Sequence, residues 1–273
     1  MNNPTKTLGG IAVLATITLA LAACSPSSAG SAGPAGPTDD SLSAVQKAGT
    51  LTVGTEGTYR PFSFHEGGSG ELTGYDVEVI KAVGAELGVE VAFEETQWDA
   101  IFAGLQAGRF DVIANQVSIT PERSAEYLFS APYTYSTGVI VVPSDNTSIT
   151  SFDSLAGTTT AQSLTSNWYT LATESGATVQ SVEGWAQSVA LVESGRVDAT
   201  VNDKLTYLDY KTQTGAAGLK IAAETDERSE SAFAFAQGST ELADAVDDAL
   251  ASLSADGTLA KISATYFGTD VSK

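Results

Sequence analysis

Two charged side chains occupy positions that favour ligand binding. Arg123 follows Thr120-Pro121, which is typical of a helix start, with Thr as the N-cap and Pro at the first helical position. A guanidinium on the first turn of a helix is suited to hold a carboxylate, because the helix dipole also favours an anion there. Asp203 ends a predicted strand, where its carboxylate could pair with a buried cation. The simpler alternatives are a surface ion pair for Arg123 and an N-cap role for Asp203.

Catalytic, metal and phosphate chemistry have little support in the sequence. The chain has one histidine, His65, in a predicted loop, and one cysteine, so we expect no metal site. The sequence contains no glycine-rich phosphate motif, and we expect no cofactor. Glu56 is the evident candidate for an acid or base in a cleft, which leaves a small dehydratase as an alternative. We assign no catalytic residue.

A segment that occurs twice indicates how these side chains are positioned. Residues 98–115 and residues 185–202 match at a constant offset that aligns Trp98 with Trp185. Each copy predicts an amphipathic helix, a glycine stop, and a short apolar strand that ends at a polar corner. Open α/β sheets bind ligands at the carboxyl ends of their strands. Two such lobes that face each other form a clamp, which favours a binding protein over an enzyme.

The rest of the chain alternates strands and helices, which predicts a largely parallel α/β architecture. The chain is expected to cross between lobes near residues 134–138 and to return near residues 225–231, and two crossing strands form a natural hinge. A glycine-rich turn at residues 66–70 predicts a hairpin. Expected helices cover residues 76–87, 99–107, about 166–175, 186–194, 204–211 and 240–253, with a short last helix ending near residue 267. Expected strands cover residues 51–55, 89–93, 111–115, 138–142, 158–162, 178–182, 197–201 and 233–236.

The N-terminal segment predicts export. The apolar run at residues 11–23 has the length of a signal-peptide core and is too short to span a bilayer. It ends in L-A-A-C, which resembles the bacterial lipobox, where the signal is cleaved before the cysteine and the thiol is lipidated. We therefore expect a signal peptide at 1–23, then a lipidated Cys24 and a flexible linker at 24–43. An incidental cysteine at an ordinary cleavage site is the alternative.

The net charge of the chain excludes some classes of binding partner. A net charge of −20 at pH 7 argues against nucleic acid, because no basic stripe could neutralise phosphates, and against docking on anionic lipid. No later segment is long and apolar enough to cross a bilayer, so the lipid would be the single membrane attachment. We expect an extracytoplasmic protein, anchored to the cell membrane through Cys24.

Several motifs, in order, resemble the polar amino-acid family of bacterial extracellular solute-binding proteins. They are G-Y-D-V-E-V at 74–79, T-E-G-T-Y-R-P-F at 55–62, S-I-T-P-E-R at 118–123 and the two repeat copies. The resemblance covers roughly residues 45–268 and implies the two-lobed type II periplasmic-binding-protein fold of the α/β class, with two crossover hinge strands. It implies a first lobe at 44–136 and 228–268 and a second at 137–227. It also implies an amino-acid ligand, a monomer, and an ABC importer as partner, through its permease and ATPase.

The resemblance also implies roles for individual residues. Arg123 falls on the carboxylate-binding arginine of the family, and Asp203 falls on the acid that binds the ammonium. Tyr59 and Trp98 correspond to aromatic walls around the ligand side chain. First-lobe hydrogen-bonding positions fall on Asn115, Gln116 and Ser118, and the second-lobe loop on Thr165 and Ser166. That loop reads Ser163-Leu164-Thr165, where the family more often has Gly-Ser/Thr-Thr.

The ligand class is left between alternatives. Residues 161–167 and 202–203 resemble the cystine-type branch, which makes a polar or sulfur-containing amino acid, cystine first, the leading expectation. Glu56 lies where some relatives bind a cationic side chain, so a basic amino acid is the second expected ligand class. Trp185 is expected to be a core residue. A sensory or adhesive surface module is a further alternative to transport.

Overall fold

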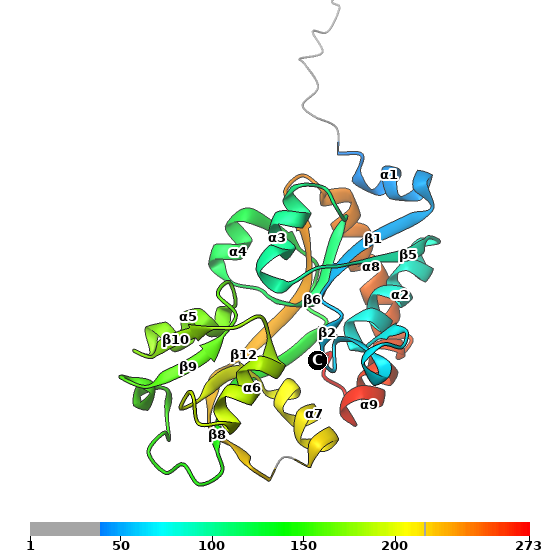
Figure 1. Cartoon of the computed structure of the whole chain (residues 1–273). Helices are drawn as coiled ribbons and strands as arrows, with labels where there is room; N and C mark the ends of the chain where they lie inside the picture. Colours follow the sequence, from blue (N-terminus) through cyan, green and yellow to red (C-terminus); the bar gives the residue numbers. More distant parts are fainter. Residues whose placement is uncertain (1–38, 216) are drawn as a thin grey trace, which may run out of the picture. The chain divides into compact units, whose positions relative to one another are not determined.

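A mixed sheet of seven strands runs through the body formed by residues 39–215 and 217–273, the residues that this computed structural model describes (Figure 1). The predictions for the signal peptide, Cys24 and most of the linker fall outside these residues. The order along the sheet is β11-β8-β12-β6-β1-β5, with β7 paired to β12. Its strands are β1 (Thr50–Thr55), β5 (Glu90–Glu95), β6 (Val112–Ser118), β7 (Tyr127–Phe129), β8 (Thr134–Pro143), β11 (Thr200–Asp203) and β12 (Leu219–Ala236).

The expectation of a largely parallel architecture is wrong for this sheet. β1 pairs in parallel with β5 and β6, whereas β12 is antiparallel to β6, β7 and β8, and β11 is antiparallel to β8. The reason is that the chain leaves one half on β8 and returns on the neighbouring β12, so the two strands must run in opposite directions. Two small sheets complete the strands: β9 (Thr159–Gln162) with β10 (Thr178–Ser181), and β2 (Thr58–Tyr59) with β3 (Ser63–His65) and β4 (Leu72–Thr73).

The hydrophobic core falls into two groups of clusters, one in each half. One group joins side chains from residues 45–133 to those from 233–271, and the other joins side chains from residues 139–223. We therefore keep the proposed division into two lobes, with the second at 137–227 and the first formed by the residues on either side of it. Figure 1 shows α2, α3 and α8 in one half, α5, α6 and α7 in the other, and β12 passing through both.

β8 and β12 form the connection that was expected near 134–138 and 225–231. They pair over a long antiparallel ladder, from Thr134 opposite Ser231 to Pro143 opposite Leu219. The strand expected at 233–236 is the end of β12, which is one strand of 18 residues. The ladder is irregular between Glu224 and Arg228, which lies at the passage from one lobe to the other.

The sequence repeat is also a structural repeat. The Asp111 amide donates to the Thr52 carbonyl and its carboxylate accepts from the Thr52 amide, both at 2.8 Å. Asp198 makes the same pair of bonds with Thr159, again at 2.8 Å each. The shared aspartate therefore ties each repeat's last loop to the first strand of its own lobe.

Apart from α1, which was not expected, the helices agree closely with the expected ones. Thr120 caps α4 by accepting from the Arg123 amide, and Gly88 ends α2 in the left-handed conformation. The 66–70 hairpin is confirmed by the pairing of β3 with β4. The helices are α1 (Ser41–Ala48), α2 (Tyr75–Leu87), α3 (Trp98–Gln106), α4 (Pro121–Glu126), α5 (Asn167–Glu174), α6 (Trp185–Glu193), α7 (Lys204–Thr214), α8 (Thr240–Ala255) and α9 (Thr258–Phe267), and short 3₁₀ turns lie at Glu66–Gly68 and Phe152–Leu155.

Three expected boundaries need correction. The linker was expected to reach residue 43, but Asp39 accepts from the Glu241 amide at 2.6 Å and α1 begins at Ser41. The first lobe extends past residue 268, because Val271 is buried in its core. The strand expected at 197–201 starts at Thr200 instead, since Asp198 is engaged with the Thr159 amide.

Candidate functional site

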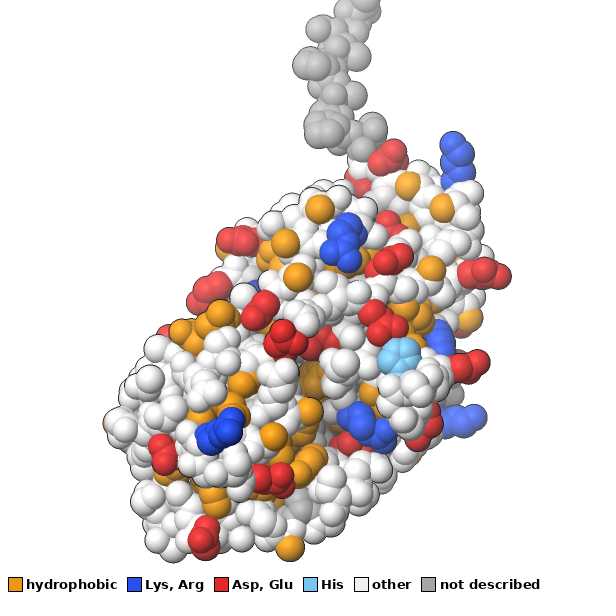
Figure 2. Space-filling view, in the orientation of Figure 1, with side chains coloured by type: hydrophobic (Ala, Val, Ile, Leu, Met, Phe, Trp, Pro, Cys, Tyr) orange, Lys and Arg blue, Asp and Glu red, His pale blue; other side chains and the backbone are white. Residues whose placement is uncertain are grey.

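A cavity of about 320 Å³ lies between the two lobes. Figure 2 shows a hollow between the two halves of the visible face, with hydrophobic side chains on its walls. Both repeat copies contribute to it, because the helices that begin at Trp98 and Trp185 start at its edge. The residues that line it are Glu56, Thr58, Tyr59, Gln97, Trp98, Asn115, Gln116, Gln162, Ser163, Ser166, Asn167, Trp168, Glu183, Gly184, Trp185, Ala186, Gln187, Ser188, Val201 and Asn202.

Six of the ten residues expected at a ligand site line this cavity. They share no single element, since they come from the loop after β1, from β2, from β6 and from the starts of α3 and α5. The six are Glu56, Tyr59, Trp98, Asn115, Gln116 and Ser166. The other four, Ser118, Arg123, Thr165 and Asp203, do not line it, and each contacts a lining residue or a sequence neighbour of one.

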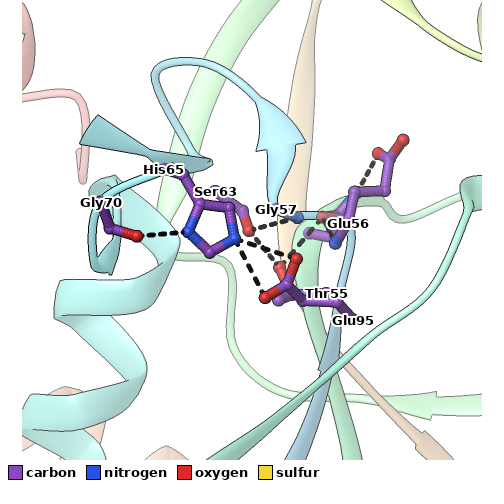
Figure 3. Close-up of polar contacts among 8 residues, drawn as sticks. Thr55, Glu56, Gly57, Ser63, His65, Gly70 and Glu95 are labelled. Carbon is purple, nitrogen blue, oxygen red and sulfur yellow. Dashed lines mark hydrogen bonds and ion pairs between the residues drawn. The ribbon is translucent and has the colours of Figure 1, made fainter. Parts of the chain in front are cut away.

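Glu56 is held in place by the end of the first repeat. The Asn115 side chain donates from Nδ2 to Glu56 Oε2 at 2.6 Å and accepts from the Glu56 amide at 2.9 Å. Beside it, Ser63 Oγ accepts from Thr55 Oγ1 and from the Gly57 amide, which fixes the loop after β1 (Figure 3). The loop therefore presents the Glu56 carboxylate in one orientation.

His65 lies outside the cavity lining. Its ring contacts the Gly70 carbonyl at 2.7 Å and the Glu95 carboxylate at 3.0 Å. In Figure 3 the Glu56 side chain points away from this pair. His65 therefore braces the hairpin and the end of β5, and it is not positioned to act on a ligand beside Glu56.

Three carboxyl groups around the cavity have no cationic partner in the described part of the chain: Asp76 and Asp203 are buried, and Glu56 is partly buried. Burial raises the pKa of Glu56 to about 7, although the Asn115 hydrogen bond opposes the shift. Burial likewise raises the pKa of Asp76 to about 7 and that of Asp203 to about 6. A buried carboxylate is costly unless it is paired, so these groups favour a positively charged ligand group.

Asp76 acts on the cavity through Gln116. Its two carboxylate oxygens accept from the Gln116 amide and from Gln116 Nε2, each at 2.6 Å. Gln116 has a φ of +51°, the left-handed conformation, in the middle of β6. Gln116 Nε2 also donates to Thr134 at the start of β8. The strained residue is therefore fixed between α2 and a crossing strand.

Arg123 connects the two lobes behind the cavity wall. Nη1 donates to the Ser118 carbonyl at 3.0 Å, and Nη2 donates to the Thr165 carbonyl of the second lobe at 3.1 Å. The guanidinium also lies over the Trp98 ring, 5.2 Å from its centroid. Burial lowers the pKa of Arg123 to about 10, so the group is charged at neutral pH.

Ser118 and Thr165 are both engaged across the lobes. Thr165 donates from its amide and its hydroxyl to Asp99 Oδ1, at 3.1 and 2.8 Å, and Ser118 Oγ contacts Asn167 Oδ1 at 3.4 Å. Further contacts between the lobes join Gln97 to Glu183 at 2.8 Å and the Tyr59 hydroxyl to Asn202 at 3.0 Å. The lobes therefore touch directly around the cavity.

Asp203 has the N-cap role that was the simpler alternative. Its Oδ1 accepts from the Leu205 amide at 2.7 Å and from Ser136 Oγ at 2.8 Å. Its neighbour Asn202 lines the cavity and accepts from Tyr59. The cap does not exclude ammonium binding, which stays a prediction.

Trp185 was expected to be a core residue, and this is only half correct. It packs in the second-lobe core and against Tyr210, but it also lines the cavity. The signal for this role was its alignment with Trp98 in the repeat. The turn before it, Glu183 and Gly184, also lines the cavity, and no motif in the sequence marked it. The strand residue Gln162 lines the cavity too; it belongs to the 161–167 motif but was not named as a site residue.

We predict that the ligand-free protein loses thermal stability between about pH 4.5 and about pH 7. A carboxyl with a higher pKa in the folded state keeps its proton more tightly there, so unfolding becomes easier as pH rises from the unfolded pKa through the folded one. For Glu56 this window runs from 4.5 to about 7. Each unit by which the pKa is raised corresponds to about 1.4 kcal/mol of unfolding free energy, and each kcal/mol changes the melting temperature by roughly 2–4 °C. Calorimetry should therefore show a fall in melting temperature of about 5 °C or more.

The variant Glu56→Gln should lose part of this pH dependence and keep the share due to Asp76 and Asp203. A melting temperature of the ligand-free protein that stays constant or rises over the same range would contradict the burial of these carboxyls.

Comparison with known proteins gives the family. The model of the bacterial extracellular solute-binding proteins, family 3, matches residues 51–269. The L-cystine-binding protein TcyA of Bacillus subtilis (strain 168) is 49% identical over 254 residues, which are 93% of this chain and 94% of that protein. These relatives are binding proteins, which confirms the expectation that this chain is a binding protein and not an enzyme.

Two solved structures bear on the arrangement of the lobes. The L-cystine solute receptor of Neisseria gonorrhoeae, in its unliganded open conformation, is 47% identical, has a TM-score of 0.59 and matches over 85% of this chain and 99% of that one. An ancestral arginine-binding protein bound to arginine is 36% identical but has a higher TM-score of 0.76, over 81% of this chain and 99% of that one. This chain therefore superposes better on the arginine-bound protein than on the unliganded open receptor, and its own lobes contact each other directly.

Fold, repeat and cavity thus agree with the type II periplasmic-binding-protein fold expected from the motifs. The chain belongs to the bacterial extracellular solute-binding proteins, family 3.

Proposed function

We propose that this protein captures a polar or sulfur-containing amino acid, with cystine as the leading candidate, and presents it to an ABC importer. One observation carries the proposal: a cavity between the lobes combines three indole rings with carboxyls that lack a cationic partner among the described residues, and a charged arginine lies behind its wall. An α-amino acid needs a cation for its carboxylate and an anion for its ammonium. Arg123 and Asp203 supply these charges in the proposed site.

The relatives support the ligand class. TcyA, which covers nearly the whole chain, is named an L-cystine-binding protein, and the gonococcal structure is a receptor for the same solute. In our proposal the ligand bridges both lobes and selects the closed state, which then docks on the permease and, through it, on the ATPase. We propose that the protein acts as a monomer.

A thermal-shift series tests the proposal. The protein is heated with each of the common amino acids, with cysteine and with cystine. A ligand that binds the folded state stabilises it by about 2.7 kcal/mol at a hundredfold excess over Kd, which is roughly 5–10 °C for a protein of this size. We expect this shift with cystine. No shift with any amino acid would reject the proposed function.

A basic amino acid is the second candidate, because Glu56 is a partly buried acid in the cavity wall without a cationic partner in the described residues. The same series separates the two candidates. A shift with arginine or lysine and none with cystine would make Glu56 the partner of a ligand side chain. In that case Glu56→Gln should abolish the shift.

The family is extracellular, so the protein works outside the cytoplasm. Among the described residues, no helix combines the length and apolar character needed to span a bilayer. We propose that lipid on Cys24 holds the protein to the membrane, with the signal peptide removed before it.

The anchor predicts a simple fractionation result. The wild-type protein expressed in its own type of host should partition into the detergent phase after extraction, and Cys24→Ser should move it to the aqueous phase. The matched control is Ser25→Ala, one residue away, which should partition as the wild type does. Equal partitioning of Cys24→Ser and wild type would refute lipidation at this cysteine.

A further inference from the structure

We propose that the cavity contains a second carboxylate subsite at the N-terminus of α6, which takes the distal end of a ligand carrying two carboxylates. The subsite consists of the free amides of the first turn of α6, Gln162 Nε2 and the Trp185 indole N–H. It rests on the proposed function and narrows it, because it selects bis-amino acids such as the disulfide-linked ones over amino acids with one carboxylate.

The first turn of α6 faces the cavity with its donors unused. Residues 184–188 all line the cavity, and Gly184 has no side chain to cap the helix. The first internal bond of the helix runs from the Ser188 amide to the Gly184 carbonyl. Among the described residues, the backbone amides of residues 185–187 have no hydrogen-bond acceptor. These amides form the positive end of the helix dipole.

Gln162 is an independent sign of a missing acceptor. It is 3% exposed and lines the cavity from β9 of the same lobe. Its amide oxygen accepts from Thr160 Oγ1 at 2.9 Å, which leaves Nε2 as the remaining donor, and Nε2 has no partner in the described residues. An unpaired buried donor is unfavourable by about 1–3 kcal/mol, so an acceptor in the cavity would relieve it.

Trp185 is a second residue of the cavity lining that carries an unpaired donor. Its ring is 9% exposed and lines the cavity, and its Nε1–H has no partner among the described residues. A carboxylate has two oxygens that can accept up to four hydrogen bonds. Helix amides, an amide Nε2 and an indole N–H are all donors, so together they suit an anion better than a neutral or cationic group.

The charges nearby favour a zwitterionic end over a bare anion. Glu183 lies immediately before the helix and lines the cavity, where its carboxylate accepts from Gln97 at 2.8 Å. It would repel sulfate or phosphate and attract an ammonium. A distal amino-acid end offers both groups, with the carboxylate toward α6 and the ammonium toward Glu183.

The geometry also allows the proximal end to bind elsewhere. The start of α5, at Ser166 and Asn167, lines the same cavity as the start of α6. The proposed proximal site includes Ser166 and the Arg123 side chain behind Trp98. A ligand with an amino-acid group at each end could therefore occupy both helix starts at once.

Titration calorimetry with two ligands tests the subsite. The first is cystine, and the second is the mixed disulfide of cysteine and cysteamine, which keeps the distal ammonium and lacks the distal carboxylate. The wild type should bind cystine at least about tenfold more tightly, which corresponds to 1.4 kcal/mol. Gln162→Glu keeps the size and the Thr160 bond but replaces the donor by a charge, so it should abolish or invert this preference.

Two further variants complete the design. Trp185→Phe keeps an aromatic ring and removes the N–H, so it should reduce the preference for cystine and leave the mixed disulfide unaffected. Gln180→Glu adds the same charge as Gln162→Glu at an exposed position of the same lobe and should change neither affinity. Melting temperatures of all variants without ligand show whether the fold is retained.

The outcomes separate the subsite from the proposed function. Equal affinity of the wild type for both disulfides, or an equal loss for both in Gln162→Glu, would overturn the subsite and leave cystine binding in place. Binding of neither disulfide together with binding of a one-carboxylate amino acid would overturn the subsite and the cystine proposal. Binding of no amino acid at all would reject the proposed function itself.

Discussion

Replacing Arg123 by alanine should weaken amino-acid binding by a hundredfold or more while the protein still folds. Arg123 is the one cation that contacts the Trp98 wall in the described structure, and its guanidinium reaches both lobes through Ser118 and Thr165. Removing one partner of a buried charged pair costs about 3–5 kcal/mol, because the other charge is left unpaired. Calorimetry with the ligand identified in the thermal-shift series measures the loss directly.

The control variants separate the roles of this side chain. Arg196→Ala removes an exposed guanidinium from the second repeat and should leave affinity unchanged. Arg123→Lys keeps the charge and loses the planar fork, so it should recover only part of the affinity. An affinity of Arg123→Ala within threefold of the wild type would rule out the carboxylate role and leave Arg123 as a structural link between the lobes.

Replacing Asp203 by asparagine should also reduce affinity strongly, by about thirtyfold or more, with little change in the stability of the ligand-free protein. The side chain caps α7 through the Leu205 amide, and asparagine is as good an N-cap as aspartate. The substitution therefore keeps the cap and removes the charge. Loss of a buried charge partner for the ligand ammonium costs about 2–5 kcal/mol.

The affinity for the ligand and the melting temperature of the ligand-free protein together decide between the two roles of Asp203. If the side chain is a cap alone, Asp203→Asn binds as the wild type does, and the ammonium role is wrong. If it binds the ammonium, affinity falls while the melting temperature of the ligand-free form stays the same or rises, because burial raises the pKa of this carboxyl and its charge is unfavourable without ligand. Asp145→Asn, at an exposed turn of the same lobe, is the matched control.

Local patterns predicted most of the secondary structure. The Thr120 cap, the Gly88 stop and the apolar face of α8 depend on residues a few positions apart, and all three occur as expected. The repeat predicted two like supersecondary units, and both carry the same aspartate bonds at the same distances. Short-range signals are sufficient here because caps, stops and helical faces are set within one or two turns of chain.

The pairing of strands in the sheet and the boundaries of several elements could be established only from the tertiary structure. α1 is short and has a single buried residue, Val45, so its stability comes from packing on the core and from the bond between Asp39 and Glu241. The antiparallel entry of β12 beside β8 joins residues more than seventy positions apart in sequence. A one-dimensional pattern of strands and helices carries no information on which strands become neighbours.

The sequence by itself determined the export signal as an expectation, the family, the two-lobed plan and six of the residues that line the cavity. It did not determine that Gln162, Glu183 and the start of α6 face the same space, nor that Trp185 serves both core and cavity. Nor could it assign the raised pKa values of Glu56 and Asp203. Burial and unpaired donors are properties of what surrounds an atom, and here those surroundings are assembled from strands and helices distant in the chain, so only the tertiary structure decided them.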